Sequence, residues 1–365
     1  MTPKERIKAT LGFADVDRVP TLGGFLTSAS QYTFFGEISK EEFHKAPYES
    51  MAKAYRSLGV DGVILMRIPQ DKEGLDEYRE VTREGFAAHQ ERFQSAEGVL
   101  AYVESLPTPE EALRQFDAAK WREEFCAGLM QRQHILGDMC WIPTQWDIVH
   151  PTFEWYNVFG YSNYMEFLAL YPNAADRLFG SEVEVKRTIA SIVVDVYRQL
   201  DIPAVVHIGT DICGNGGPIV NPAYLRRYYF PHIKRSLAPL HEAGFKTVWH
   251  SDGIITPIVD DILDCGVSGF QGFQWELGLR LDEIVAKRTV TGEKLIIFAG
   301  PSVTTTMYRS GEDIKAELRY IVDTAFSASG LFILPNSDLM PNIPLENIAE
   351  AYRYAADYSK SHKKS

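Results

Sequence analysis

The feature that most constrains the fold is a series of eight short apolar runs, separated by longer amphipathic stretches. Several of these runs are continuously apolar, which is typical of strands buried on both faces, as in a parallel sheet. We predict one strand from each run. The runs cover residues 19–26, 60–66, 138–144, 202–208, 245–250, 267–271, 294–299 and 330–334.

The stretches between the runs carry helix signals. Asn221-Pro222 predicts a helix start, with Asn221 as the N-cap and proline at the first helical position. Ser310 and Asp313 have the spacing of a capping box. Strand and helix alternate along the whole chain, which predicts an α/β fold: one (β/α)₈ TIM barrel over residues 1–365. An open doubly wound sheet is the alternative, but no G-x-G-x-x-G follows an early strand.

Two segments fall outside the simple alternation. Residues 72–100 resemble a hairpin inserted after the second strand, and residues 107–125 resemble one further amphipathic helix. Because there is no internal repeat and no low-complexity linker, we do not divide the chain into domains.

Composition restricts the partners. The net charge is −12 and no basic stripe is present, so we expect no nucleic-acid partner. No apolar stretch reaches the roughly 18 residues of a membrane span, so we expect no membrane and a cytoplasmic location. The four cysteines are scattered, which argues against a disulfide framework. A homo-oligomer is compatible with this composition.

Polar residues after the strands are the candidates for chemistry, because barrel active sites lie at the carboxyl ends of strands. His250 and Asp252 share a face and could orient a proton or, with one more ligand, bind a metal. A structural role, with Asp252 capping the next helix, stays open. His207 and Asp211 carry the same ambiguity. We expect His250, Asp252, Asp211 and Glu276 to line one cavity.

Aromatic residues gather in the same loops and favour a pocket for a flat, apolar substrate. We expect five residues of the third, sixth and eighth loops to bind the substrate: Trp146, Phe273, Trp275, Glu276 and Asn336. We expect Cys213 and Cys265 to have structural roles.

Several segments resemble the uroporphyrinogen decarboxylase superfamily. They are Pro3–Ala9, Asp17–Pro20, Gly217–Pro222, Phe230–Lys234, Ala243–Gly244 leading to His250–Gly253, and Pro341–Ile348. The resemblance spans nearly the whole chain and implies a (β/α)₈ barrel. The superfamily contains the decarboxylases of haem biosynthesis and the corrinoid-dependent methyltransferases.

The residues do not follow the decarboxylase pattern. Its arginine-rich M-R-Q-A-G-R segment corresponds to residues 23–31, which contain no arginine. Its catalytic aspartate after the second strand corresponds to residues 65–68, which contain no carboxylate. A substrate rich in carboxylates needs cationic partners.

The methyltransferases that methylate coenzyme M bind zinc through H-x-C and a later cysteine. Here Asp252 and Ser337 occupy the two cysteine positions. The resemblance therefore implies the branch that moves a methyl group from a small donor, such as a methoxylated aromatic, to the Co(I) corrinoid (cobalamin) of a partner protein. His250, Asp252 and Asp211 would be catalytic, with His250 and Asp252 able to hold zinc. The alternatives are uroporphyrinogen decarboxylase and a non-catalytic barrel that acts as a binding module.

Overall fold

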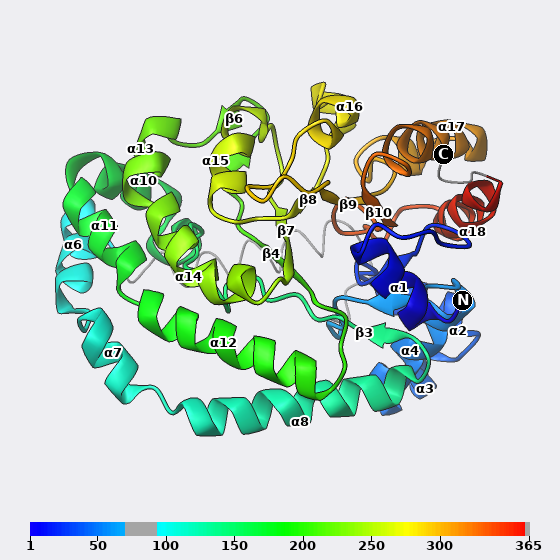
Figure 1. Ribbon diagram of the computed structural model, residues 1–365, viewed down its shortest axis with the longest axis horizontal. Helices are drawn as coiled ribbons and strands as arrows, with labels where there is room; N and C mark the ends of the chain where they lie inside the picture. Colours follow the sequence, from blue (N-terminus) through cyan, green and yellow to red (C-terminus); the bar gives the residue numbers. More distant parts are fainter. Residues whose placement is uncertain (70–92, 362–365) are drawn as a thin grey trace.

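The computed structural model describes residues 1–69 and 93–361 (Figure 1). It shows an α/β fold in which each of the eight apolar runs overlaps one strand, and β4 extends one residue past its run. The strands are β1 (Leu22–Gly23), β2 (Gly62–Val63), β3 (Cys140–Trp141), β4 (Val205–Gly209), β7 (Lys246–His250), β8 (Gly269–Gln271), β9 (Ile296–Ala299) and β10 (Gly330–Ile333).

These strands form two parallel sheets, in the orders β1-β2-β3 and β10-β9-β8-β7-β4. A parallel bridge pairs Thr21 with Ile333, and the Ile333 N–H donates to the Pro20 carbonyl over 2.9 Å. At the other edge, the Gln145 N–H, beyond β3, donates to the His207 carbonyl of β4 over 2.8 Å. The predicted parallel α/β architecture is confirmed.

The helices lie outside the strands (Figure 1). None of those in the described part of the chain is long and apolar enough to cross a membrane. In the amino-terminal half they are α1 (Pro3–Leu11), α2 (Ala29–Gly36), α3 (Lys40–Lys45), α4 (Pro47–Ser57), α6 (Ala96–Ser105), α7 (Pro109–Gln115), α8 (Ala118–Leu136), α9 (Tyr156–Phe159), α10 (Tyr161–Leu170), α11 (Pro172–Gly180) and α12 (Val183–Gln199).

The remaining helices follow β4. They are α13 (Pro222–Tyr228), α14 (Phe230–Glu242), α15 (Val259–Asp264), α16 (Leu281–Val285), α17 (Gly311–Ala325) and α18 (Leu345–Lys360), with 3₁₀ turns η1 (Thr256–Ile258), η2 (Trp275–Leu277) and η3 (Thr306–Tyr308). The predicted caps are confirmed, since Asn221 accepts from the Ala223 N–H over 2.9 Å and Ser310 forms a capping box with Asp313.

Three local features differ from the sequence predictions. The helix expected over 107–125 is two helices, because the Asp117 carboxylate accepts from the Lys120 N–H and so starts α8. Of the hairpin expected over 72–100, residues 72–92 lie outside the described residues, and the described end is helical from Ala96. A short antiparallel hairpin that was not predicted, β5 (Cys213–Gly214) with β6 (Gly217–Pro218), follows β4.

Side chains of the strands alternate between two hydrophobic clusters. On β4, Val205 belongs to an inner cluster and Val206 to a larger one; on β7, Val248 and Trp249 divide in the same way. The inner cluster draws on both sheets and on α1, through Leu22, Ile64, Cys140, Ile142, Ile296, Phe298, Phe332, Leu334, Ile7 and Leu11. The two sheets therefore share one inner core, and the larger cluster fills the space beneath the helices.

The two-residue period of a strand directs three polar side chains to the inner side. His207 is two residues after Val205, His250 two after Val248, and Gln271 is paired with His250 in the register of β7 and β8. The His207 ring stacks on Phe298 of the inner core at a centroid distance of 6.3 Å.

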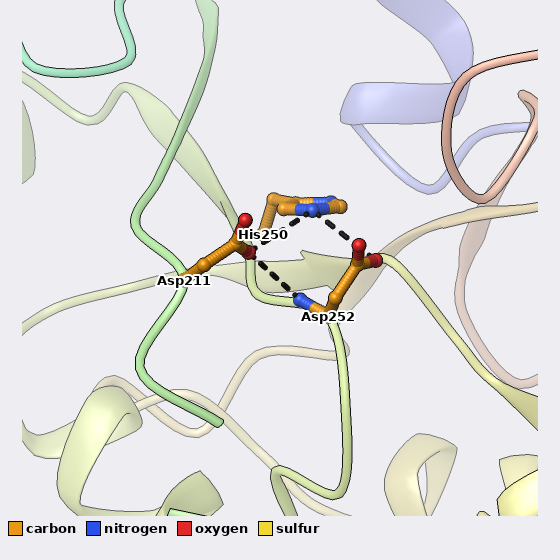
Figure 2. A group of neighbouring side chains, drawn as sticks. All are labelled: Asp211, His250 and Asp252. Carbon is orange, nitrogen blue, oxygen red and sulfur yellow. Dashed lines mark hydrogen bonds and ion pairs between the residues drawn. The ribbon is translucent and has the colours of Figure 1, made fainter. Parts of the chain in front are cut away.

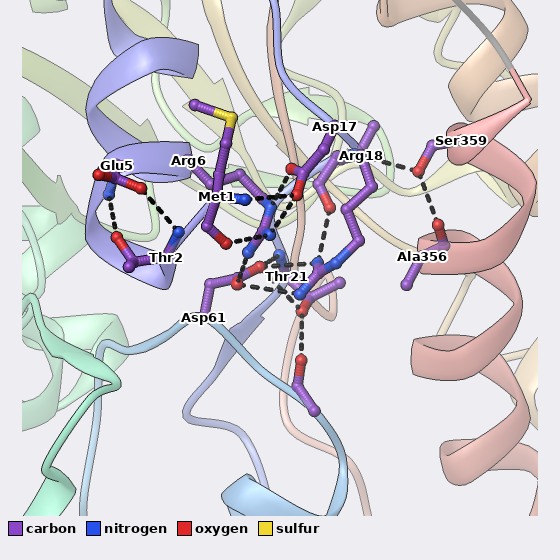
Figure 3. A network of polar contacts seen from close by, with 12 residues as sticks. Met1, Thr2, Glu5, Arg6, Asp17, Arg18, Thr21, Asp61, Ala356 and Ser359 are labelled. Carbon is purple, nitrogen blue, oxygen red and sulfur yellow. Dashed lines mark hydrogen bonds and ion pairs between the residues drawn. The ribbon is translucent and has the colours of Figure 1, made fainter.

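A buried ionic network ties α1 to the start of β1 and β2 (Figure 3). Asp61 has 1% of its surface exposed and accepts hydrogen bonds from Arg6 Nη1, from Arg18 Nη1 and Nη2 over 2.8 and 3.0 Å, and from the Thr21 N–H over 2.9 Å. Arg6 also contacts Asp17. These arginine and aspartate side chains are shielded from water but paired with one another. Removal of one carboxylate would therefore leave arginine charge uncompensated.

We expect Asp61→Asn to lower the free energy of unfolding by about 3–5 kcal/mol, because two arginines lose their shared carboxylate in a buried site. Asp201→Asn is the matched control. Asp201 also pairs with two basic side chains, Lys4 and Lys8, but is 70% exposed, and its loss costs about 1 kcal/mol or less. Urea unfolding of both variants measures the difference; equal losses would contradict the assigned role of the buried network.

Candidate functional site

The structure brings His250, Asp211 and Asp252 together at the carboxyl ends of β4 and β7 (Figure 2). His250 ends β7 and has 5% of its surface exposed, while Asp211 and Asp252 lie on the loops that follow the two strands. His250 Nε2 is 3.6 Å from Asp211 Oδ1 and 3.5 Å from Asp252 Oδ1. Of the four residues expected in one cavity, these three form a single cluster.

Backbone and side-chain contacts hold Asp211 in place. Its Oδ1 accepts the Asp252 N–H over 3.0 Å, which joins the two loops. Its own N–H donates to Glu154 Oε1 over 3.0 Å, and the same oxygen accepts Trp146 Nε1–H over 2.9 Å. Glu154 thus links the Trp146 ring to the Asp211 backbone. Sequence reasoning missed Glu154, and its position eight residues after Trp146 gave no signal of this contact.

The opposite side of the His250 ring contacts Gln271, a second residue that sequence reasoning missed. His250 Nδ1 is hydrogen-bonded to Gln271 Oε1, and His207 Nε2 lies 3.3 Å from the same oxygen. Gln271 Nε2 donates to the carbonyls of Pro335 and Asn336 over 2.9 and 2.8 Å. One signal was available in the sequence: Gln271 ends the strand that follows the His250 strand, at a position where its side chain lies on the same face of the sheet.

Two glycines make room for this arrangement. A Cβ on Gly272 would lie 2.7 Å from His250 Nδ1, and one on Gly253 would lie 2.5 Å from the Gly214 carbonyl oxygen. Both residues have positive φ, +96° and +84°, a conformation that glycine adopts at little cost.

Burial governs the electrostatics of the site. Burial, together with the neighbouring His250, lowers the pKa of His207 to about 3, so that ring is neutral at pH 7. Burial also raises the pKa of Asp252; the His250 ring opposes this shift and Asp211 adds to it. Burial raises the pKa of the Cys213 and Cys265 thiols to about 12. Neither cysteine is therefore a thiolate at neutral pH, which agrees with their predicted structural role.

Two adjacent cavities open at this end of the strands. The first, about 380 Å³, is lined by Phe25, Ile64, Leu65, Arg67, Thr144, Trp146, His207, Asp211, His250, Asp252, Ser337 and Asp338. The second, about 320 Å³, shares Asp252, Ser337 and Asp338 with it and adds Glu276, Phe273 and Tyr308 among others. The expectation of one cavity is corrected here: Glu276 lies in the second, where it accepts from Ser302 Oγ over 3.0 Å.

The expected substrate-binding residues take different positions. Trp146 lies at a ring-centroid distance of 5.0 Å from His250 in the first cavity, and Phe273 lines the second. Trp275 is not among the residues that line either of these cavities; it stacks on Phe273 at 5.1 Å. Asn336 also lines the second cavity, but it is 2% exposed and its amide is bonded to the backbone of Gly300 and Phe273, so it holds two loops together.

A larger hollow of about 760 Å³ lies between α1, α8 and the segment before β4, at the amino ends of the strands. Because parallel α/β sheets bind ligands at the carboxyl ends of their strands, we place the candidate site at His250.

The donor set of the cluster suits a divalent cation. One ligand atom each from Asp211, His250 and Asp252 lies within 4.8 Å of the others. One imidazole nitrogen and two carboxylate oxygens are zinc ligands, and three protein ligands leave a position open, as in catalytic zinc sites. The contact from Gln271 to the other ring nitrogen is the kind of partner that zinc-binding histidines have.

We expect Gly272→Ala to displace the His250 ring, because the new methyl group would overlap Nδ1. The cost should exceed that of Gly278→Ala by about 1–3 kcal/mol, the usual cost of overpacking. Gly278 is the matched control, since its φ is +82° but a Cβ added there would have no atom within 4 Å. Urea unfolding and the His250 imidazole resonances would measure both effects; identical behaviour of the two variants would refute the close approach.

Comparisons with known proteins agree with this fold. The family described as uroporphyrinogen decarboxylase (URO-D) matches residues 158–358, which is more than half of the 365 residues. A solved methyltransferase from Methanosarcina mazei is similar over 98% of this chain and 99% of that chain, with a TM-score of 0.64 and 16% sequence identity. At that identity the likeness is one of fold. No curated protein matched the sequence. The chain belongs to the uroporphyrinogen decarboxylase family.

Proposed function

We propose that this protein is a methyltransferase that moves a methyl group from a small donor, a methoxylated aromatic compound, to the Co(I) corrinoid of a partner protein. The observation that carries the proposal is the position of His250 Nε2, 3.5 and 3.6 Å from two carboxylates, beside an aromatic wall in a cavity of about 380 Å³.

The reaction needs charge compensation at one atom. As the methyl group leaves in line toward Co(I), the donor oxygen retains the electron pair of the broken C–O bond and becomes a phenolate. A proton or a metal ion at that oxygen stabilises the transition state. His250 is the residue that could supply either, as a proton donor through Nε2 or as a ligand.

Asp211, His250 and Asp252 would hold a Zn²⁺ ion in this proposal. When bound, the ion supplies positive charge to the leaving oxygen as a Lewis acid. Asp211 is oriented by the Asp252 N–H and by the Glu154 contact behind it, so the two carboxylates keep their positions on either side of the ring. The thiols are unsuited to this role, because those of Cys213 and Cys265 stay protonated.

The walls of the first cavity support a flat donor. Phe25, Ile64, Leu65 and Trp146 provide apolar surface in the same cavity as the polar cluster. Such a pocket binds an aromatic ring by area burial and orients its oxygen through a small number of polar groups. The corrinoid would be presented by its own protein at the open end of the same cavity.

Charge weighs against decarboxylation of uroporphyrinogen. Among the described residues that line the first cavity, one is basic, Arg67, which is paired with Asp338 at 3.1 Å, and three are aspartates. These aspartates would repel a porphyrinogen with carboxylates around its rim, whereas binding of such carboxylates needs cationic side chains.

We further propose that residues 1–365 form one domain and that the strands close as a barrel. Support comes from the two backbone contacts that link the sheets, one between Ile333 and Pro20 and one between Gln145 and His207, and from the inner core that both sheets share.

The proposal predicts that His250→Ala loses most methyl transfer while remaining folded. Removal of a general acid typically costs about 10²–10⁴ in rate, and Asp252→Asn should lose a comparable share. Cys213→Ser and Cys265→Ser should retain near-normal rates, because their thiols do not ionise. The measurement is the rate at which a reduced corrinoid protein becomes methylated, followed by absorbance, with a panel of methoxylated aromatics.

Uroporphyrinogen serves as the negative substrate in the same set. Full activity of His250→Ala would remove the proposed centre. Decarboxylation of uroporphyrinogen at about 1 per second or faster would replace methyl transfer with the alternative activity. Binding of the corrinoid protein without turnover of any donor would favour a binding module.

A further inference from the structure

The carboxamide of Gln271 has one orientation that its surroundings allow. The side chain is fully buried, and its Nε2 lies 2.9 and 2.8 Å from two backbone carbonyl oxygens, those of Pro335 and Asn336. A flipped amide would set its oxygen against both carbonyls, where no hydrogen is available to either partner. The NH₂ group therefore faces the β10 side, and Oε1 faces the two histidines.

Because Oε1 can only accept, it fixes which histidine nitrogens carry hydrogen. The atom of His250 that contacts Oε1 is Nδ1, so Nδ1 is the protonated nitrogen. In the neutral ring the lone pair is then on Nε2, the nitrogen that faces Asp211 and Asp252. The tautomer of His250 is thus set from the side of the ring remote from the carboxylates.

The same oxygen acts on His207. Its Nε2 lies 3.3 Å from Oε1, and its Nδ1 lies 2.9 Å from Thr144 Oγ1. With Nε2 as donor to Gln271, the neutral ring accepts at Nδ1 from the Thr144 hydroxyl, whose other acceptor, the His207 carbonyl oxygen, is farther away at 3.3 Å. Although His207 lines the same cavity as His250, both of its nitrogens are occupied in this arrangement.

We propose that Gln271 is a positioning residue that holds His250 as the Nδ1–H tautomer, makes Nε2 the metal-binding nitrogen, and keeps His207 out of the ligand set. The metal-binding part of this inference rests on the proposed function. The tautomer does not, because it follows from hydrogen bonds within the protein. A partner that fixes a ligand histidine in this way typically contributes 10–100-fold to metal affinity.

The first test is zinc affinity of the metal-stripped protein, measured by competition with a chromophoric chelator. Gln271→Met fills a similar volume but provides no comparable acceptor, and it should weaken zinc binding by about 10–100-fold. His207→Ala should leave the affinity close to that of the wild type, because His207 is not a ligand.

Gln31→Met is the matched control. Gln31 is also fully buried, and its amide also makes four hydrogen bonds, all of them to the backbone: Oε1 accepts from Thr27 and Ser28 over 2.8 and 3.0 Å, and Nε2 donates to Leu339 and Met340 over 2.9 and 3.2 Å. It contacts neither histidine, so Gln31→Met should lose stability but keep zinc affinity. Equal weakening in the two variants would reduce Gln271 to a structural role.

The second test reads the tautomer without metal. Nitrogen-15 imidazole spectra of the metal-free wild-type protein, at a pH where His250 is neutral, should show Nδ1 protonated and Nε2 bare, with His250→Ala identifying the resonances. Gln271→Met, which provides no comparable acceptor, should give a mixture of the two tautomers. A wild-type ring protonated at Nε2 would overturn the inference. If the wild-type protein binds no zinc, the metal part of the proposed function fails, while this spectrum still decides the tautomer.

Discussion

The inward register of β4, β7 and β8 is the constraint on which the site depends. Val205 and Val248 are fixed in the inner core by burial, and the two-residue period of the strands then forces His207 and His250 to the same side. Gln271, in register with His250 on β8, follows. A shift of one residue in either strand would turn its histidine toward the helices. It would also remove Val205 or Val248 from the inner core.

Residues on the loops that follow the strands complete the site. Asp211 and Asp252 come from different βα loops, and the hydrogen bond from the Asp252 N–H to the Asp211 carboxylate links them over 3.0 Å. On the far side, Gln271 and Gly272 shape the space beside His250 Nδ1. His250 Nε2 therefore faces two carboxylates, while Nδ1 is hydrogen-bonded to the Gln271 amide. Half-buried carboxylates near one another, such as Asp211 and Asp252, are costly, and a proton or a cation would offset that cost.

The sequence predicted this arrangement in part. Eight strand positions, the capping residues Asn221 and Ser310, and the pairing of His250 with Asp252 followed from local rules of burial, capping and strand parity. Strand parity places Gln271 on the inner side, but its role and that of Glu154 come from contacts with residues 21 and 57 positions distant, which local rules do not predict. The break at Asp117 was missed because its carboxylate starts a second helix inside an otherwise helical pattern. Glu276 was assigned to the wrong cavity because the loops after β8 and β9 fold against each other.

We propose that Asp211, His250 and Asp252 form one reaction centre that binds a divalent cation. The most direct measurement is the anomalous scattering of crystals grown with Zn²⁺, recorded at the zinc absorption edge. We expect a single strong peak about 2.0–2.2 Å from His250 Nε2 and from one oxygen of each carboxylate. A peak bound to His207, a peak in the hollow beside α1 and α8, or no peak near Nε2 at a saturating zinc concentration would contradict it.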